Sequence, residues 1–204
     1  MVNSTSDFYQ EEAKKYFDST YHIKLNNIWD YSVDFIPQNA KILDLGCGSG
    51  RDILFFSSLF ENVIGLDLSY NLSYLARVHT SQPIVQADFK FAPFANNSFD
   101  VVWSIGSLLH VKKENIIHAL IEIRRMLIND GLLIVSLKKG VGEETLPDGR
   151  FFAYYSKNEW KAILSKCGFK LLKIKITKEE RFLNNSEKSI TIPWLFTISQ
   201  KKKE

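Results

Sequence analysis

The stretch from Lys41 to Gly50 (KILDLGCGSG) constrains the fold of this chain more than any other. Its first half is apolar without polar alternation, which is typical of a parallel strand covered on both faces. Gly46, Gly48 and Gly50 then remove the β-carbon at every second position, which permits positive φ and lets a ligand approach the backbone. An apolar helix is expected at 51–60, with its free N–H groups aimed back at the loop. A strand, a glycine turn and a helix N-terminus together predict a nucleotide-type site, although the G-x-G-x-G spacing differs from the G-x-G-x-x-G of NAD enzymes.

Acidic residues end the next two predicted strands. The strand at 62–67 ends in Asp67, about 20 residues after the glycine turn begins, where a carboxylate can accept hydrogen bonds from both ribose hydroxyls of a nucleoside. The strand at 83–88 ends in Asp88 and is followed by Phe89, a pair that can bind the amino group and the face of an adenine.

Each of these carboxylates also has a simpler interpretation. Asp67 could cap the next helix, at 70–79, although Ser69 can do so equally well. Asp88 could be an ordinary loop residue. The register favours the ligand, because Asp44, Asp67 and Asp88 end three successive strands on the same edge of the predicted sheet.

A fourth strand is predicted at 98–104, and the segment from Ser104 to His110 leads off its carboxyl end. Ligands of open α/β sheets bind beyond these ends, so this segment should border the pocket. His110 is the candidate general base because its side chain titrates near neutral pH; the alternative is that it packs at the start of a helix. A helix at 114–128, stopped by the glycine of 129–131, and a fifth strand at 132–137 complete the alternating pattern.

Two amphipathic helices are expected before the first strand, at 7–17 and 22–36, the second ended by Pro37. Their aromatic residues could simply pack the helices onto the sheet. The alternative is a lid over the ligand, with Tyr16 and Tyr21 as the first candidates to face it.

The pattern changes after the fifth strand. A long loop is expected at 138–150, and then a helix that a capping box opens at 156–159 and that Cys167-Gly168 closes. In and after the loop, Arg150 could pair with an anionic ligand, and Tyr154 belongs to an aromatic run that could contact it or pack in the core.

Two antiparallel strands are predicted to end the sheet, at 171–176 and 190–199, joined by a charged hairpin loop at 178–189. Pro193 must then lie at a strand start or a bulge, because it cannot donate to an interior ladder.

Length and composition set further bounds. The 204 residues suffice for one domain with a full core. The net charge of +3 comes partly from Lys201–Lys203, so a broad basic face for nucleic acid is not expected. Two cysteines, Cys47 and Cys167, suggest neither a disulfide scaffold nor a metal cluster. Without an apolar signal core or an apolar run of about 18 residues, a cytoplasmic protein with no membrane span is expected.

Five βα units, the glycine loop, the two acidic strand ends and the terminal strand pair together resemble the class I S-adenosylmethionine-dependent methyltransferases. The resemblance covers residues 34–199. Its most specific motifs are ILDLGCGSG (42–50), VIGLD (63–67), VQAD (85–88), FDVVWS (99–104) and RRMLINDGLLIVS (124–136). It implies an α/β, Rossmann-like fold with a seven-stranded, mostly parallel sheet, an antiparallel terminal strand pair and N-terminal lid helices.

By this resemblance the cofactor is S-adenosylmethionine. The glycine loop with Asp44 would hold its methionine part, Asp67 the ribose, and Asp88 with Phe89 the adenine, while Ser104 would border the methyl group. The implied cofactor-binding residues are Asp44, Gly46, Cys47, Gly48, Gly50, Asp67, Leu68, Asp88, Phe89 and Ser104. The candidates for binding the methyl acceptor are Tyr16, Tyr21, Arg150 and Tyr154.

A single methyltransferase domain would then span residues 1–204. Its parts would be lid helices at 1–36, cofactor-binding units at 37–137, an acceptor-side segment at 138–200 and a basic tail at 201–204.

The favoured function is methyl transfer to an O or N atom of a small molecule, with no metal and no membrane involved. No Asn-Pro-Pro-Tyr-like motif follows the fourth strand, and no Cys lies near the fourth or fifth strand, which disfavours amino methylation of nucleic-acid bases or glutamine and carbon-5 cytosine chemistry.

Two alternatives remain open. SIGSLLHV (104–111) also resembles methyltransferases of modified wobble uridine in tRNA, and an RNA acceptor would require lysines 112, 113, 138, 139 and 201–203 to share a face. The chain could also be a cofactor-binding subunit whose activity depends on a partner.

Overall fold

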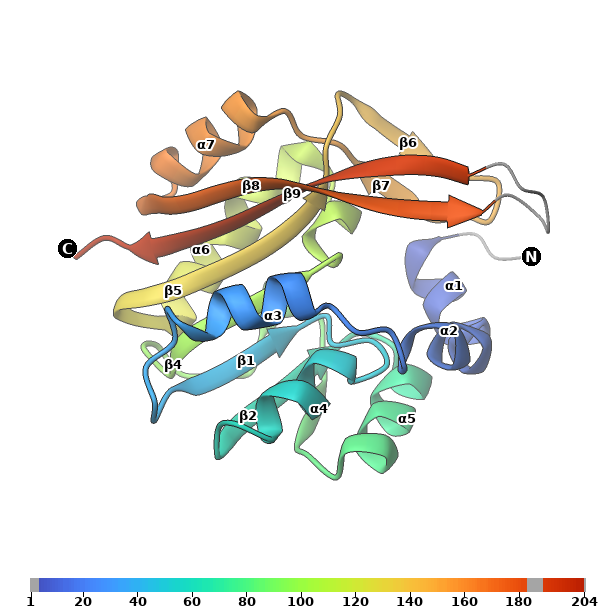
Figure 1. Cartoon of the computed structure of the whole chain (residues 1–204), viewed down its shortest axis with the longest axis horizontal. Coiled ribbons are helices and arrows are strands. Elements are labelled where there is room, and N and C mark those ends of the chain that lie inside the picture. Colours follow the sequence, from blue (N-terminus) through green and yellow to red (C-terminus); the bar gives the residue numbers. More distant parts are fainter. Residues whose placement is uncertain (1–3, 183–188, 204) are drawn as a thin grey trace.

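The computed structural model describes residues 4–182 and 189–203. A seven-stranded sheet with the order β3-β2-β1-β4-β5-β9-β8 forms its centre (Figure 1). Its strands are β1 (Lys41–Leu45), β2 (Asn62–Asp67), β3 (Ile84–Gln86), β4 (Phe99–Ile105), β5 (Leu127–Lys138), β8 (Phe169–Phe182) and β9 (Ser189–Lys201). The first five run parallel, and β9 pairs antiparallel with both β5 and β8. The predicted fold class is therefore confirmed.

Helices and one small hairpin surround this sheet. The helices are α1 (Thr5–Glu11), α2 (Ala13–Thr20), α3 (Asn26–Val33), α4 (Arg51–Ser57), α5 (Tyr70–Thr80), α6 (Ile116–Met126) and α7 (Lys157–Lys166). Short 3₁₀ turns are η1 (Phe89–Phe91), η2 (Leu108–His110) and η3 (Lys113–Asn115), and β6 (Glu143–Thr145) pairs with β7 (Phe151–Ala153). Figure 1 shows α1 and α2 at the end of the sheet toward which β1 points. The described helices include none that is both long and apolar enough to cross a membrane.

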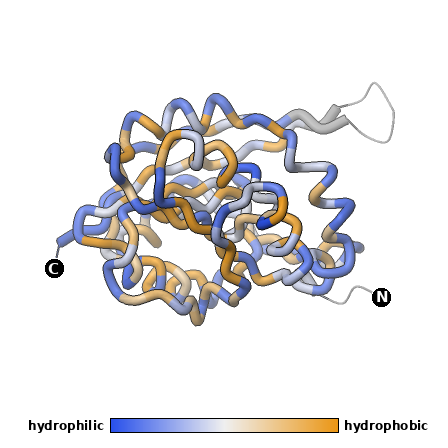
Figure 2. Tube along the Cα trace, turned by 90° about the horizontal axis from the view of Figure 1, so that it is seen from below, coloured by the Kyte–Doolittle hydropathy of each residue, from blue (hydrophilic) through white to orange (hydrophobic). Residues whose placement is uncertain are grey.

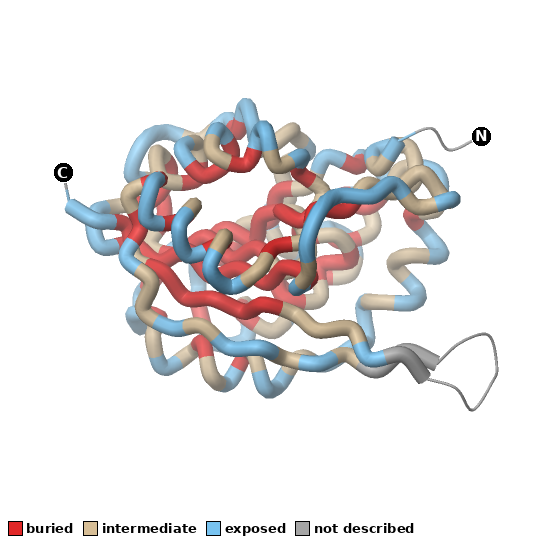
Figure 3. Tube along the Cα trace, turned by 90° about the horizontal axis from the view of Figure 1, so that it is seen from above, coloured by how far each residue is buried: buried red, intermediate tan, exposed pale blue. Residues whose placement is uncertain are grey.

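The sheet is covered on both faces, as the apolar strands predict. On one face Ile42 and Val101 pack with residues of α3 and α4, and on the other Leu43 and Val102 pack with residues of α6 and α7. Hydrophobic residues gather along the inner strands (Figure 2). These strands are also buried, whereas the described side chains of the edge strand β8 are mostly half-buried or exposed (Figure 3). Full burial of one such side chain contributes about 1.5–3 kcal/mol, so this double layer fixes the frame that carries the site.

The N-terminal helices differ from their predicted bounds. The helix expected at 7–17 is broken at Glu12 into α1 and α2, and the one expected at 22–36 is shortened to α3. The break lets α1 bring Gln10 to Ser69 and Asn71, while α2 brings Tyr16 over the glycine loop. The contacts of α1 with the start of α5 and those of α2 with the glycine loop lie in different directions, and together they break the helix that the sequence pattern predicts.

The boundary between α6 and β5 also moves. A helix at 114–128 and a strand at 132–137 were the prediction, but α6 ends at Met126 and β5 begins at Leu127. Leu127 is fully buried and pairs with Phe99 at the start of β4. Pairing with a neighbouring strand ends the helix before the glycine at 131 can.

Smaller differences affect β3 and β4. The strand expected at 83–88 is reduced to β3, so that Asp88 lies two residues beyond it and begins η1. The strand expected at 98–104 is shifted by one residue in β4. The helix α7 opens with the predicted capping box, in which Ser156 and Glu159 satisfy each other's backbone N–H groups, and is followed by Cys167.

The terminal strand pair is longer than predicted. The loop expected at 138–150 contains β6, and the hairpin loop expected at 178–189 is wrong for 178–182, which continue β8; residues 183–188 lie outside the described part of the chain. The prediction that Pro193 lies at a strand start or a bulge is wrong. Pro193 lies in the regular interior of β9, opposite Lys178 of β8, at a point where β9 extends beyond the end of β5, and its carbonyl accepts from Lys139 N.

The expected basic tail is wrong at its first residue. Lys201 ends β9 and is 5% exposed, and its ammonium donates to Leu127 O at 2.7 Å and to Asn97 Oδ1 at 3.0 Å. A buried ammonium with these bonds holds the β9 terminus against the start of β5 rather than facing solvent.

Candidate active site

Two cavities lie at the carboxyl end of the parallel strands. The first, of about 550 Å³, lies between the glycine loop, Asp67 and Asp88, and the second, of about 770 Å³, lies between α2, α3, β7 and the outer ends of β8 and β9. Five residues line both cavities and are called here the shared wall: Tyr9, Tyr16, Ile105, Gly106 and His110. Molecules in the two cavities would meet across this wall.

The glycine loop forms one side of the first cavity through two of its three glycines. Gly46 has φ +75°, and a β-carbon there would lie 2.0 Å from Ser107 Oγ. Gly48 has φ +53°, with the Tyr16 ring 3.3 Å from where its β-carbon would be. Both line the first cavity. The absence of side chains here allows η2 and α2 to close on the loop.

Gly50 and Cys47, both predicted to bind the cofactor, point elsewhere. A β-carbon on Gly50 would contact Ala76 and Thr80 of α5, so this glycine allows close packing of helices. The Cys47 thiol is buried beside Gly65, and burial raises its pKa well above the usual value. Neither residue is among those that line the two cavities, so both have a packing role within the fold.

Asp67 is fixed at the end of β2 by two backbone donors. Its Oδ2 accepts from Gly48 N and its Oδ1 from Ser69 N, both at 2.9 Å. Burial raises the pKa of Asp67, which these backbone bonds oppose. The cap of α5 is Ser69, whose hydroxyl accepts from Leu72 N, so the carboxylate is not used as the helix cap. Asp67 and the neighbouring Leu68 line the first cavity.

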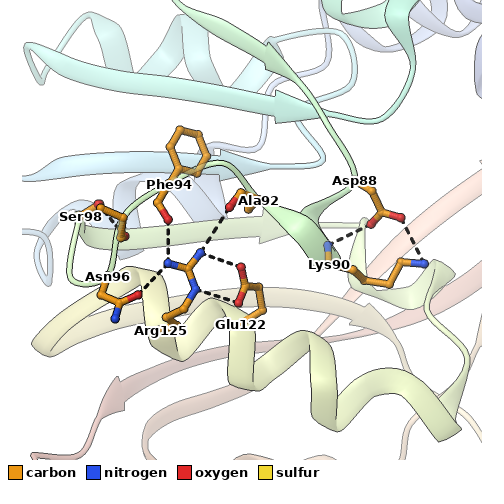
Figure 4. Close-up of polar contacts among 9 residues, drawn as sticks. Asp88, Lys90, Ala92, Phe94, Asn96, Ser98, Glu122 and Arg125 are labelled. Carbon is orange, nitrogen blue, oxygen red and sulfur yellow. Dashed lines mark hydrogen bonds and ion pairs between the residues drawn. The ribbon is translucent and has the colours of Figure 1, made fainter.

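Asp88, Phe89 and Lys90 line the opposite end of the first cavity. Asp88 begins η1: its Oδ1 accepts from Lys90 N at 2.9 Å, and its Oδ2 is 3.2 Å from Lys90 Nζ (Figure 4). Asp88 can therefore be both a loop residue that begins η1 and a residue that binds a ligand, because its carboxylate has lone pairs left after these contacts.

Arg125 of α6 holds the segment that follows η1. Its guanidinium donates to the carbonyls of Ala92 and Phe94 and to Asn96 Oδ1, and pairs with Glu122 (Figure 4). Five fixed donors in one planar group suit this task. The cluster fixes the chain between β3 and β4, and with it the side of the first cavity that Asp88 and Phe89 form.

Two predicted cofactor-binding residues are buried beneath the site. Asp44 is 2% exposed and Ser104 is fully buried, and Asp44 Oδ2 and Ser104 Oγ have no hydrogen-bond partner among the described residues. Burial, with the nearby Asp52 carboxylate, raises the pKa of Asp44 well above its usual value. An unpartnered buried carboxyl oxygen is costly and fits a site that receives a polar, cationic ligand.

His110 is held by both ring nitrogens. Nδ1 lies 2.6 Å from the Phe151 carbonyl and Nε2 lies 2.9 Å from the Tyr9 hydroxyl. Since a carbonyl can only accept, Nδ1 carries the hydrogen, and neutral Nε2 accepts from Tyr9. Burial lowers the pKa of His110 to about 4, against the Phe151 bond, with the charges of Arg150 and Lys138 adding to the decrease. The imidazole is therefore neutral at pH 7.

The N-terminal helix α1 is fastened at several points over the site. Thr5 Oγ1 accepts from Phe151 N at 2.8 Å, and the Tyr9 carbonyl accepts from the Ser69 hydroxyl at 2.9 Å. Arg150 stacks on Phe8, with Cζ 4.3 Å from the ring centroid. These contacts join α1 to β7 and to the start of α5, so that Tyr9 of this helix is held at the border of both cavities.

The four predicted acceptor-binding residues divide into two pairs. Tyr16 belongs to the shared wall and Arg150 lines the second cavity. Tyr21, 39% exposed and stacked on Phe17, lines neither cavity. Tyr154 also lines neither, and its hydroxyl donates to Glu144.

The lysines that an RNA acceptor requires do not share one open face. Lys113 pairs with Glu159 at 2.7 Å, Lys138 is 9% exposed with its ammonium 3.7 Å from the Phe152 centroid, and Lys201 is buried as described above. The condition set for the RNA alternative is therefore not met by these residues.

The most informative site residue that the sequence analysis did not select is Tyr9. The spacing of seven residues between Tyr9 and Tyr16 would place both on one face of a continuous helix, but the helix breaks at Glu12, so only the fold shows that both reach the shared wall. Ser107 was also missed as the side chain that packs on Gly46, since only the fold brings them together.

Comparison with known proteins agrees with this geometry. Residues 43–135 match the model of the methyltransferase domain family. An uncharacterised protein of Methanocaldococcus jannaschii, MJ1252, is 34% identical over 134 residues, which are 64% of this chain and 50% of the relative. The O-methyltransferase cnsE of Penicillium expansum is 27% identical over 159 residues, 70% of this chain and 56% of that protein. The chain thus spans about half the length of the curated relatives it matches.

Solved structures show the same fold. A methyltransferase of Haloferax volcanii, solved in complex with the activator Trm112, superposes with a TM-score of 0.80 at 17% identity, over 98% of this chain and 99% of that one. The 1,6-didemethyltoxoflavin N1-methyltransferase of Burkholderia thailandensis, solved with its acceptor and S-adenosylhomocysteine, gives 0.69 at 17% identity over 95% and 86%. Together with the glycine loop and the acidic strand ends, these matches establish that the chain belongs to the class I S-adenosylmethionine-dependent methyltransferases.

Proposed function

We propose that this chain binds S-adenosylmethionine in the first cavity and transfers its methyl group to an O or N atom of a small molecule in the second. The observation that carries the proposal is the shared wall, because it is the one surface at which contents of both cavities come together. Methyl transfer needs the acceptor atom opposite the sulfonium, and two adjoining cavities supply that arrangement.

The residues of the first cavity fit the parts of this cofactor. Asp67, Asp88 and Phe89 all line this cavity. Asp67 would accept from the ribose hydroxyls, and Asp88 with Phe89 would bind the adenine. Gly46 and Gly48 leave the loop backbone open to the methionine part. Asp44 is not part of the cavity lining; it lies buried beneath the loop with one oxygen that has no partner among the described residues, and this oxygen would receive the ammonium group. When bound, the cofactor supplies a methyl group already activated as a sulfonium.

Residues of α1 and α2 would act as a lid that positions the acceptor and excludes water. Tyr9 of α1 and Tyr16 of α2 line both cavities, and Ile23 and Ile28, which follow α2 in the chain, line the second one. A cavity of about 770 Å³ suits a small molecule. An O-methyltransferase and an N-methyltransferase of small molecules are among the similar proteins, which supports this acceptor class without choosing between the two atoms.

Two measurements test the proposal. Calorimetric titration of the purified chain should show binding of S-adenosylmethionine and none of NAD; the reverse result would refute it. Labelled S-adenosylmethionine is then incubated with the chain and with small metabolites, RNA and protein separated from a cell extract. Label should enter the small-metabolite fraction, whereas label in RNA or protein alone would refute the acceptor class.

A further inference from the structure

None of the five residues of the shared wall has a side chain suited to remove a proton from a methyl acceptor. The titratable members of the shared wall are Tyr9, Tyr16 and His110. Both ring nitrogens of His110 are engaged, and the Tyr9 hydroxyl donates to one of them. Burial raises the pKa of Tyr9 and of Tyr16, and lowers that of His110 to about 4. A base this weak removes few protons from an alcohol or a phenol at pH 7.

Cationic side chains surround the second cavity. Lys24, Arg51, Lys138, Arg150 and Lys178 belong to its lining. The acidic residue of the same lining is Glu179, which accepts a hydrogen bond from Trp194 Nε1 at 2.7 Å.

The partner carboxylates of the two arginines lie outside the lining. Asp52 pairs with Arg51 at 2.9 Å and is buried, where it also accepts from the indoles of Trp29 and Trp103. Asp148 pairs with Arg150 at 2.6 Å. Each carboxylate orients its guanidinium and offsets part of its charge, and because only the arginines belong to the lining, it is their preorganised N–H groups that border the cavity.

Two of these cations flank an aromatic ring next to the shared wall. The Lys138 ammonium lies 3.7 Å and the Arg150 Cζ 5.6 Å from the Phe152 centroid, and that centroid is 4.8 Å from the His110 ring. A positively charged, partly apolar surface therefore adjoins the place where the acceptor atom must lie. A carboxylate on an apolar body matches both properties.

We propose that the acceptor is a small-molecule carboxylate and that one carboxylate oxygen is the nucleophile. This inference rests on the proposed function. The oxygen forms the new O–CH₃ bond while the S–CH₃ bond of the sulfonium breaks, its electron pair remaining on sulfur. An anion and a cation become a neutral methyl ester and a neutral thioether, and no proton moves. His110 then acts as a positioning residue that holds Tyr9 in the wall, and Arg150 and Lys138 bind the anion.

The test separates a small-metabolite extract on a strong anion exchanger at pH 7 before incubation with the chain and labelled S-adenosylmethionine. Label should enter the retained, anionic fraction. The product should no longer bind the exchanger, and mild alkali should release the label as methanol, as expected of a methyl ester. Label only in the unretained fraction, or label stable to alkali, overturns the inference and leaves the proposed function standing. No methylation in any fraction overturns both.

A binding measurement supplies a readout independent of turnover. The chain saturated with S-adenosylhomocysteine is titrated with benzoate and hexanoate and with their primary amides. The carboxylates should bind at least tenfold more tightly than the amides, and Arg150→Gln should remove that preference. Because Arg150 also stacks on Phe8 of α1, the affinity of the variant for S-adenosylhomocysteine is measured first, and acids and amides are compared at saturation with it. Arg77→Gln, which changes an exposed arginine on α5, is the matched control and should keep the preference. Equal binding of acids and amides by the unaltered chain contradicts the anion site.

Discussion

The hydroxyl of Tyr9 donates to Nε2 of His110 across 2.9 Å, joining residues that are 101 positions apart in the chain. The direction of this bond follows from the other ring nitrogen, which must donate to the Phe151 carbonyl. The Phe151 carbonyl therefore fixes the tautomer of the histidine, and the bond from Tyr9 adds one more attachment of the N-terminal helix beside both cavities.

Removing the Tyr9 hydroxyl should loosen the closed site. Tyr9→Phe leaves His110 Nε2 buried without a donor, so we expect a loss of about 1–3 kcal/mol in the free energy of unfolding, measured by urea denaturation. Methyl transfer should fall while cofactor affinity changes less, since the ring itself still covers the cavity. Tyr70→Phe, at a position 63% exposed on α5, should change neither quantity. Equal stability of Tyr9→Phe and the unaltered chain would contradict the bond.

The histidine predicts a pH dependence of stability. Its pKa is about 4 in the folded chain and about 6.5 when unfolded, so the unfolded state binds the extra proton first as the pH falls. Stability should decrease between pH 6.5 and 4, by about 3 kcal/mol at most, and the loss is complete below pH 4. In His110→Asn, which keeps a donor for the Phe151 carbonyl, this contribution should be absent. The measurement compares urea denaturation of both proteins at pH 7, 6, 5 and 4.

The same variant separates the two roles of His110. If the acceptor arrives as an anion, His110→Asn should retain turnover within about tenfold, with a pH profile of kcat/KM that is flat from pH 6 to 8. A loss of 100-fold or more, with cofactor binding intact, would instead support the general base predicted from the sequence.

Asp67 should control cofactor affinity. Asp67→Asn replaces one acceptor oxygen with a donor facing Gly48 N or Ser69 N, and removes the charge near the ribose. We expect affinity for S-adenosylmethionine to fall 10- to 100-fold by calorimetry, as for hydrogen bonds to a charged group. Asp18→Asn, an exposed carboxylate on α2 that pairs with Lys14, should bind normally. Unchanged affinity in Asp67→Asn would refute the ribose assignment.

Gly46 offers a steric test with an internal control. Gly46→Ala puts a methyl group 2.0 Å from Ser107 Oγ at φ +75°, whereas Gly142→Ala has φ +84° but no atom within 4 Å. The second variant should lose only about 1–2 kcal/mol from the left-handed backbone, measured by thermal unfolding, and the first should lose more and also bind the cofactor poorly. Adding Ser107→Gly should restore part of the loss in Gly46→Ala. No difference between the single variants would contradict the close packing of η2 on the loop.

Local signals in the sequence predicted the frame of the molecule well. β2 has its predicted bounds, because a buried apolar run between polar residues has few alternatives, and the capping box of Ser156 and Glu159 is satisfied within four residues. The alternation of predicted strands and helices along the chain also predicted that the sheet would be mostly parallel.

Features that depend on distant partners could not be predicted in this way. Leu127 ends a helix because Phe99 pairs with it, and the ammonium of Lys201 is buried because Asn97 and the Leu127 carbonyl receive it. Pairing along β9 likewise extends β8 through residues that read as a charged loop. Six of the predicted cofactor-binding residues line the first cavity: Gly46, Gly48, Asp67, Leu68, Asp88 and Phe89. The other four do not: Asp44, Cys47, Gly50 and Ser104. A sequence pattern does not reveal which way each residue of a strand end or a tight turn points.

The N-terminal helices have a consequence for the timing of the reaction cycle. Tyr9 and Tyr16 form part of the boundary of both cavities, and α1 is fastened to β7 on one side and to Ser69 on the other. Neither compartment can be opened wide by moving these helices without opening its neighbour. A movement of α1 that widens one compartment would therefore widen the other, so the departures of spent cofactor and of methylated product should be coupled in time.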